Sequence, residues 1–280
     1  MLNFSKKVMV SLSVVTAIAL TGCTPSQNGS EKQELTKANS VLDAYANIAL
    51  ANYSDALKDA KVLKVAIDEF AKKPTLENLN KAKVAWLLSR ESYGQTEIFR
   101  LANGPADAEE GWVADTYGAL EGQINAWPLD ENMIDYTIDA EGKRTSGNII
   151  DTIGSFNPGG EESKEVDVTK ITVEAITDLN ENGGDANVAS GYHAIEFLLW
   201  GQDQDYSNFL KDGITHGALT PGLRPLKDFT TDKNASRRLA YLKAASEKLV
   251  ADLEVITSAW EKDIEGTKGL YQAALKGQLT

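Results

Sequence analysis

The chain has 280 residues with 28 basic and 41 acidic side chains, a formal charge of −13, one cysteine and two histidines. So acidic a surface argues against binding nucleic acid and against electrostatic docking on anionic lipid. A single cysteine excludes an intramolecular disulfide, and a length in this range suffices for one large domain or two small ones.

Residues 1–23 are expected to be a removable signal peptide. Two lysines precede an apolar run from Val8 to Leu20, which is too short to span a membrane comfortably and has the build of a secretory signal. The run ends in Leu-Thr-Gly-Cys, which resembles a bacterial lipoprotein cleavage box, so cleavage would leave Cys23 as the lipid attachment point. The mature chain would then carry 26 basic and 41 acidic residues, a charge of −15. Residues 24–33 are expected to form a polar tether.

The next segment predicts two long helices. Residues 31–73 contain no Gly or Pro, and apolar side chains recur there at steps of three and four, as in a long amphipathic helix. Pro74 and Thr75 end this helix and begin a second one, which is expected to run to about Asn103. The short connection favours antiparallel packing, so the segment predicts the start of a bundle. The inward stripe of the first helix consists of Leu35, Ala38, Leu42, Tyr45, Ala49, Tyr53, Ala56, Ala60, Leu63, Ile67 and Phe70.

The inward stripe of the second helix is unusually polar, because Arg90, Glu97 and Arg100 occupy positions where a plain bundle would place Leu. Buried charge is costly unless it is paired or coordinated. Either this stripe reaches the wet end of the bundle, or Arg90 and Glu97 line a polar site between helices. The pattern alone leaves both interpretations open.

The rest of the chain predicts further helices joined by irregular segments. Residues 106–163 are rich in Gly, Asp and Asn, and so long a non-repetitive stretch is typical of a functional segment or an insertion. No fixed-period repeat, Gly-rich phosphate loop or Ser-centred nucleophile motif is present, so the sequence predicts an all-α fold. The expected later helices are Glu110–Gln123, Val168–Leu179, Asp185–Gly201, a long one from about Thr231 to Trp260, and Leu270–Leu275.

One predicted helix carries the most promising site chemistry, in the run Gly-Tyr-His-Ala-Ile-Glu. His193 and Glu196 lie one turn apart on the same face of that helix. An imidazole and a carboxylate at this spacing can both reach one metal ion, as the Glu-x-x-His pairs of carboxylate-bridged helix bundles do. Gly191 removes a side chain where another backbone or a ligand could approach closely.

Two simpler interpretations of this pair are open as alternatives to a metal site. A lone histidine on an apolar helix is commonly a hydrogen-bonded core residue, and a His–Glu pair at this spacing can be a simple ion pair. The run is not a zinc-peptidase signature, because the inverted form of that signature needs a histidine where Phe197 stands. The second histidine, His216, is expected to be a solvated loop residue.

Several segments in the same order resemble the imelysin-like family, and within it the iron-regulated protein A type. The G-x-H-x-x-E element is the most specific part of the resemblance, which covers about Leu35 to Trp260. The other segments that carry it are Ala85-Trp86, Arg90, Glu97-Ile98-Phe99-Arg100, Asn103-Gly104-Pro105, Trp127-Pro128-Leu129-Asp130 and Arg237-Arg238-x-x-Tyr241-Leu242.

The resemblance implies two helical bundles packed side by side, here residues 34–163 and 164–280, with long irregular connections and a site between them. Carried over by position, His193 and Glu196 are the motif pair, and Glu97 is a further metal ligand. Family members usually continue well beyond the end of this chain, so the second bundle is expected to be incomplete and the chain a truncated member. Further residues expected to line the site are Arg90, Trp127, Asp130, Gly191, Tyr192 and Arg224.

Two functions follow from the resemblance and the residues together. The first is a lipid-anchored extracytoplasmic protein of iron uptake that binds iron or another divalent metal, since one imidazole with carboxylates suits such ions. Haem capture is a variant, with His193 as axial ligand and Trp86, Tyr192 and Trp200 as candidate walls. The alternative is a metallopeptidase of the insulin-cleaving imelysin type, which needs three protein ligands and an open position.

The expected partners include the bacterial membrane, most simply the outer membrane, to which the lipid anchor would attach. The protein is also expected to bind the metal or an iron-containing ligand and to meet other iron-uptake proteins. No nucleic acid is expected among its partners.

Overall fold

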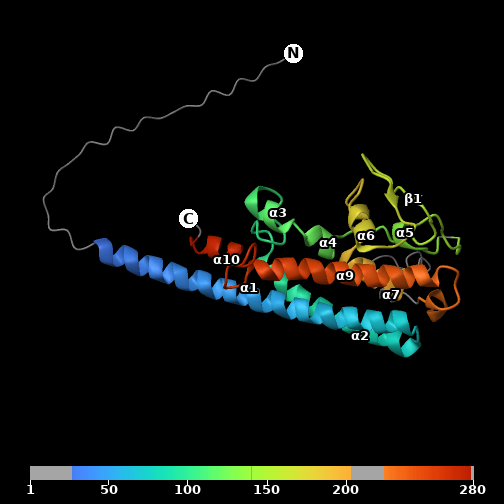
Figure 1. Ribbon diagram of the computed structural model, residues 1–280, viewed down its shortest axis with the longest axis horizontal. Helices are drawn as coiled ribbons and strands as arrows, with labels where there is room; N and C mark the ends of the chain where they lie inside the picture. Colours follow the sequence, from blue (N-terminus) through green and yellow to red (C-terminus); the bar gives the residue numbers. More distant parts are fainter. Residues whose placement is uncertain (1–26, 140, 203–223, 279–280) are drawn as a thin grey trace, which may run out of the picture. The chain divides into compact units, whose positions relative to one another are not determined.

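The computed structural model describes residues 27–139, 141–202 and 224–278 (Figure 1). The signal peptide, Cys23 and His216 lie outside these residues. The chain divides into two units, residues 1–40 and 41–280. In the first unit, the described part is the beginning of helix α1, which starts at Gln27. Residues 27–33 are therefore helical, whereas the sequence predicted a tether there.

The fold is all-α, as predicted. A two-stranded antiparallel sheet pairs Ser155 with Asp167 and Phe156 with Val166 in the described part of the chain. The elements in chain order are α1 (Gln27–Lys72), α2 (Leu76–Gly94), the 3₁₀ helix η1 (Gln95–Phe99), α3 (Gly111–Tyr117), α4 (Glu121–Asn125), α5 (Glu131–Ile134), β1 (Ser155–Phe156), β2 (Val166–Asp167), α6 (Val173–Leu179), α7 (Gly191–Trp200), the 3₁₀ helix η2 (Leu226–Phe229), α9 (Ala235–Ala259) and α10 (Leu270–Leu275).

Helix α1 buries the predicted apolar stripe from Ala49 to Phe70 against its neighbours. Pro74 follows the helix, and Thr75 begins α2 by accepting a hydrogen bond from the backbone N–H of Asn78. The α1–α2 hairpin and α9 lie side by side along the molecule (Figure 1). Tyr53 stacks on Trp260 at the end of α9.

Four helices differ from the sequence prediction. The helix expected at Val168–Leu179 starts only at Val173, as α6, with Thr172 as its N-cap. Helix α2 gives way to η1 after Gly94, where Thr96 turns its hydroxyl back onto the carbonyl of Tyr93, so regular helix does not reach Asn103. The helix expected at Glu110–Gln123 is split into α3 and α4, because Gly118 takes a left-handed conformation that caps α3. The helix expected from Asp185 starts only at Gly191.

Helix α7 is largely buried. It packs against α2, α4 and α9, and its side chains join one hydrophobic core with those of α1, α2 and α9. That core contains residues from both sides of the expected boundary after residue 163. The division into two bundles stays a prediction. No helix of the described residues has the length and hydropathy needed to cross a membrane.

Candidate functional site

The start of α7 is held rigidly against α4. Gly191 has φ +80°, and a Cβ atom there would lie 2.3 Å from the carbonyl oxygen of Ile124. The hydroxyl of Ser190 donates to the carbonyl of Gln123 at 2.7 Å, and the indole N–H of Trp86 donates to the carbonyl of Tyr192 at 2.9 Å. Only glycine fits this close approach, so the expected role of Gly191 in permitting it is matched by the geometry.

His193 and Glu196 lie on the one face of α7 that is not enclosed by the core. The Nδ1 atom of His193 and the Oε2 atom of Glu196 are 3.0 Å apart, and their side chains are 17% and 42% exposed. The neighbours Tyr192, Ala194 and Ile195 are fully buried. The two side chains are hydrogen-bonded to each other and form a partly exposed polar pair on a buried helix, with the histidine the more buried of the two.

Trp127 provides a wall for this pair. Its ring lies 4.9 Å from the imidazole of His193, centroid to centroid, at an interplanar angle of 59°. The indole is 66% exposed, and it belongs to the Trp-Pro-Leu turn that follows α4. An exposed indole against an imidazole shields one face of the histidine from solvent.

Two cationic side chains of α2 lie beside α7. The guanidinium of Arg90 stands 5.5 Å from the ring centre of Tyr192 and 5.6 Å from that of Tyr93. The ammonium of Lys83 stands 5.1 Å from the ring centre of Trp200, and burial together with the charge of Arg224 lowers the pKa of Lys83. The flank between α2 and α7 thus carries two cationic side chains, each packed over an aromatic ring of α7.

The geometry of the pair accommodates a metal ion in part. Two ligand atoms at about 2.1 Å from one ion and at a right angle to each other are about 3.0 Å apart, which is the observed separation of Nδ1 and Oε2. In residues 27–139, 141–202 and 224–278, no three His, Cys, Asp or Glu side chains are grouped to hold an ion. His193 and Glu196 can therefore supply two ligands, and the remaining positions would fall to water or to a bound molecule.

Glu97 does not join them, which corrects the expectation of a three-residue site. It lies on η1 and is exposed. Helix α2 ends at Gly94, so the register that would have carried Glu97 onto the inward face is lost.

Glu121 on α4 is the buried acid of this region, and the sequence reasoning missed it. It forms an ion pair with Arg100 at 2.8 Å and accepts a hydrogen bond from the hydroxyl of Tyr93. Burial raises the pKa of Glu121, and these two partners offset part of that rise. The two arginines of the polar stripe thus have different partners. Arg100 pairs with Glu121, whereas Arg90 lies over the rings of Tyr93 and Tyr192.

The other predicted site residues have structural roles in the described geometry. Tyr192 is fully buried, and its hydroxyl lies 2.8 Å from that of Ser89. Asp130 is exposed and caps α5 by accepting from the N–H of Asn132. Arg224 is enclosed, with its side chain 1% exposed, and hydrogen bonds the carbonyl of Phe197 on α7. Trp86 and Tyr192 belong to the core and are not available as haem walls.

Arg224 belongs to a buried ion-pair network, which we call the Asp135 network. The carboxylate of Asp135 accepts from Arg224 at 2.5 Å and from Arg238 at 2.7 and 3.1 Å. Asp228 and Asp232 neutralise the same two arginines at 3.3 and 2.8 Å. Burial opposes ionisation of Asp232, but hydrogen bonds from Arg238 and Asn234 outweigh it and hold its pKa below the ordinary range. The family resemblance names two members of this network, Arg224 and Arg238, but it gives no indication of their shared partner Asp135.

A small cavity adjoins the Asp135 network. It encloses about 160 Å³ and is lined by Tyr136, Ile138, Gly201, Gln202 and Arg224. Burial and the hydrogen bond to Asp228 raise the pKa of Tyr136 to about 12. A polar cavity of this size has room for water, so it can solvate the network from within.

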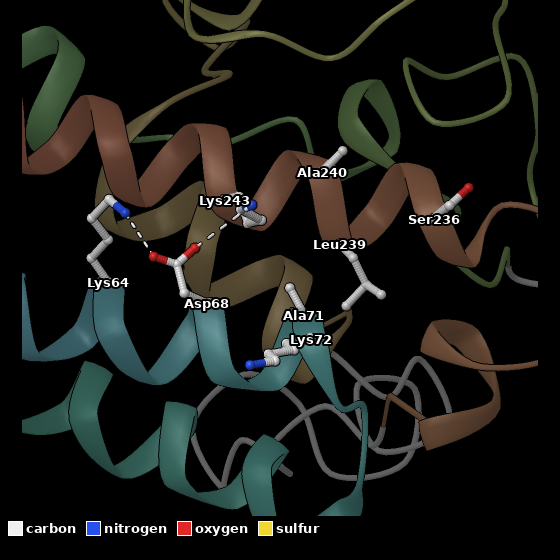
Figure 2. A pocket seen from close by; sticks show the side chains of 8 residues that line it. All are labelled: Lys64, Asp68, Ala71, Lys72, Ser236, Leu239, Ala240 and Lys243. Carbon is white, nitrogen blue, oxygen red and sulfur yellow. Dashed lines mark hydrogen bonds and ion pairs between the residues drawn. The ribbon is translucent and has the colours of Figure 1, made fainter.

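The larger groove lies between α1 and α9 and has a different character (Figure 2). It encloses about 720 Å³, and Asp68 stands at its middle, 2.7 Å from Lys64 and 3.9 Å from Lys243. Lys72 also lines it. The carboxylate pairs with two of the three lysines, and the groove has no titratable pair comparable to His193 and Glu196.

Comparison with known proteins identifies the family of the chain. A curated protein named iron-regulated protein A, from Synechococcus elongatus, is 31% identical over 83 residues, which are 30% of this chain and 20% of that protein. A crystal structure described as an iron-regulated protein A precursor from Parabacteroides distasonis has a TM-score of 0.50 and 23% identity, over 92% of this chain and 52% of that one. The chain thus spans about half the length of the solved relative. The sequence profile of the Imelysin family matches residues 49–279, so the chain belongs to the imelysin family.

Proposed function

We propose that this protein binds iron or another divalent metal through His193 and Glu196, in an extracytoplasmic role in iron uptake or homeostasis. The observation that carries the proposal is the half-exposed pair itself. Its two ligand atoms are 3.0 Å apart on a helix whose other faces are buried. A core histidine would be enclosed, and a surface ion pair would not have its backbone fixed by a glycine pressed against a neighbouring helix.

The ligand types support a metal of intermediate hardness. One imidazole nitrogen and one carboxylate oxygen suit iron, manganese or zinc better than ions that prefer thiolates. Both similar proteins carry the name iron-regulated protein A. We therefore take iron as the first ion to test.

The same geometry allows two roles for Glu196. With Nδ1 facing the carboxylate, the imidazole can present Nε2 to a metal while Glu196 orients the ring, as carboxylates commonly do for ligating histidines. Alternatively, Nδ1 and Oε2 both bind the ion. The two roles differ in whether a neutral acceptor at position 196 can replace the carboxylate.

The described residues bring two protein ligands together. The metal would therefore be bound together with ligands that it brings with it. Iron in a chelate or in haem fits this requirement, with His193 as the protein ligand and the exposed face of Trp127 as a wall. Lys83 and Arg90 lie along the same α2–α7 flank and could neutralise acidic groups of such a molecule. A zinc peptidase site needs three protein ligands and an open position, and the described residues bring two together. Binding is for that reason our first proposal over peptidase activity.

The location and partners are part of the proposal. Lipidation of Cys23 would anchor the chain to the bacterial membrane, with the outer membrane as the expected site and the periplasm or the cell surface as the face. The acidic surface is compatible with this display. Other iron-uptake proteins would deliver or receive the ion.

The test is calorimetric titration of the chain from Thr24 onward, which contains every described residue, with Fe(II) under anaerobic conditions and with Zn(II). We expect one site of micromolar or tighter affinity, weakened at least about tenfold in His193→Ala and in Glu196→Ala. Glu97→Ala is the matched control and should bind as the wild type does, because Glu97 is exposed on η1.

A further variant, Glu196→Gln, separates the two roles of the carboxylate. An orienting role predicts affinity close to that of the wild type, since the amide oxygen can still accept from Nδ1–H. A ligand role predicts the loss seen in Glu196→Ala. Absence of binding in the wild type, with the helical circular dichroism intact and with haem also failing to bind, would refute the proposed function.

A further inference from the structure

Helix α1 exposes a second stripe opposite the one it buries. Reading from Val41, exposed residues recur at alternating steps of three and four, which is the heptad spacing of a coiled coil. We call this stripe the outer seam. Its four large members, at positions 41, 48, 62 and 65, are between 52% and 66% exposed. The seam consists of Val41, Ala44, Ile48, Ala51, Asp55, Lys58, Val62 and Val65.

The outer seam is apolar on both sides of one charged pair, Asp55 and Lys58, with four apolar members before it and two after it. Neither charged residue has an ion-pair partner among the residues that the structure describes. Elsewhere the lysines of α1 at positions 61 and 64 are paired with acids. A heptad seam that contains one opposite-charge pair is therefore left without a partner helix on this face.

We infer that the outer seam binds the outer seam of a second copy of this chain, in antiparallel orientation about a twofold axis between Ala56 and Leu57. In that arrangement Asp55 of one copy faces Lys58 of the other, and the pair occurs twice. The symmetry then places Ala51 opposite Val62 and Ile48 opposite Val65, whereas Val41 and Ala44 lie beyond these layers, opposite Lys72 and Glu69. In an antiparallel coiled coil, the a positions of one helix lie opposite the d positions of the other, as they do here. A contact about a twofold axis must also be self-complementary.

A parallel, in-register pairing is excluded by the same residues. It would set Asp55 against Asp55 and Lys58 against Lys58 at the centre of the contact. Like charges facing each other across an interface are strongly unfavourable. The charge pattern therefore favours the antiparallel direction for a contact between two copies.

The neighbouring helix extends the contact surface. Ser92 on α2 donates to Asp59 on α1, and the two helices run antiparallel, so Leu88 lies at the level of Val62. Leu88 is 60% exposed. The exposed apolar surface is therefore wider than one helix at the Val62 end, which favours a stable dimer over a transient contact.

Charge exchange tests the inference. Sedimentation equilibrium of the chain from Thr24 onward should show a dimer at micromolar concentration. Asp55→Lys and Lys58→Asp should each weaken the dimer about ten- to a hundredfold, because each sets like charges opposite one another. The double variant should restore the wild-type constant. Glu109→Lys, an exposed change of the same charge far along the chain, should leave the constant unaltered.

Disulfide trapping fixes the direction of the contact. Ile48 and Val65 of one chain are about 25 Å apart along the helix, too far to be bridged within a copy. The combination of Ile48→Cys with Val65→Cys should oxidise to a covalent dimer, and Ile48→Cys alone should not. Cross-linking of the single variant would show a parallel pair. A wild-type monomer at tens of micromolar, or single charge variants that dimerise as the wild type does, would overturn the inference and leave the seam to a different partner.

Discussion

Two polar constellations adjoin α7 and differ in almost every physical respect. The Asp135 network is enclosed, and its acids and arginines neutralise one another at side-chain exposures of 1% or less for Asp135, Arg224 and Arg238. The His193–Glu196 pair is partly exposed, with side-chain exposures of 17% and 42%. The comparison teaches that charge density alone does not mark the site. A saturated buried network holds the fold together, whereas the pair is available to a ligand.

The largest expected effect comes from breaking the Asp135 network. Asp135→Ala leaves Arg224 and Arg238 buried with fewer partners, so we expect it to lower the free energy of unfolding by about 3–5 kcal/mol. Urea denaturation followed by circular dichroism measures this. His193→Ala is the comparison variant and should change the same quantity by no more than about 1 kcal/mol.

Equal losses in the two variants would contradict the distinction between a structural network and an accessible site. Asp130→Ala serves as a second control, because this acid is exposed and its one observed role is to cap α5. Its loss should cost about 1 kcal/mol, as for other N-caps.

The next effect concerns the backbone that holds the pair in place. Gly191→Ala forces a Cβ atom to 2.3 Å from a carbonyl oxygen at φ +80°, so we expect a loss of at least about 2 kcal/mol in unfolding free energy. Metal affinity should fall together with stability, because the start of α7 must shift and His193 lies two residues further on.

A matched control separates strain from contact. Gly111 has φ +78° and open space around it, so Gly111→Ala carries the strain of the left-handed conformation without the collision. We expect it to cost about 1 kcal/mol and to leave metal affinity unchanged. If the two variants behave alike, the close approach of Gly191 to α4 does not position the site.

The contrast also shows which parts of the molecule local sequence could predict. The α1 stripe, the α1–α2 turn at Pro74–Thr75 and the final short helix at Leu270–Leu275 follow from spacing and capping within a few residues, and the structure confirms them. His193 and Glu196 lie one turn apart on a helix, so their proximity is likewise local.

The Asp135 network could not be predicted in the same way. Asp135 meets Arg224 across 89 residues and Arg238 across 103 residues of sequence. The late start of α7 has a similar origin, since the side chain of Asn180 accepts from the backbone N–H groups of Ala189 and Ser190 and holds that segment as a loop. Long-range contacts outweigh helix propensity at such places.

A smaller, pH-dependent effect distinguishes the buried acid of α4 from the exposed pair. Burial raises the pKa of Glu121 above its unfolded value. The carboxyl group therefore favours the folded state below its unfolded pKa, and this contribution is lost as the pH rises through the folded pKa. Glu121→Gln removes the titration, so its unfolding free energy should decline less steeply than that of the wild type from pH 4 to pH 8. Urea denaturation across that range tests this, and parallel curves for the two proteins would contradict it.

The smallest expected change in stability tests the wall of the site. Trp127 is 66% exposed, so Trp127→Ala should alter the unfolding free energy by about 0.5 kcal/mol or less. It should still weaken metal binding by up to about tenfold, because the imidazole of His193 loses the ring that shields one face of it. Trp112→Ala is the matched control, since this indole is 46% exposed and contacts Tyr271 instead. Metal affinity at a partly exposed site depends on such a wall, whereas the stability of the fold does not. Trp127→Ala should therefore lose metal affinity without losing stability, in contrast to the variants of the Asp135 network.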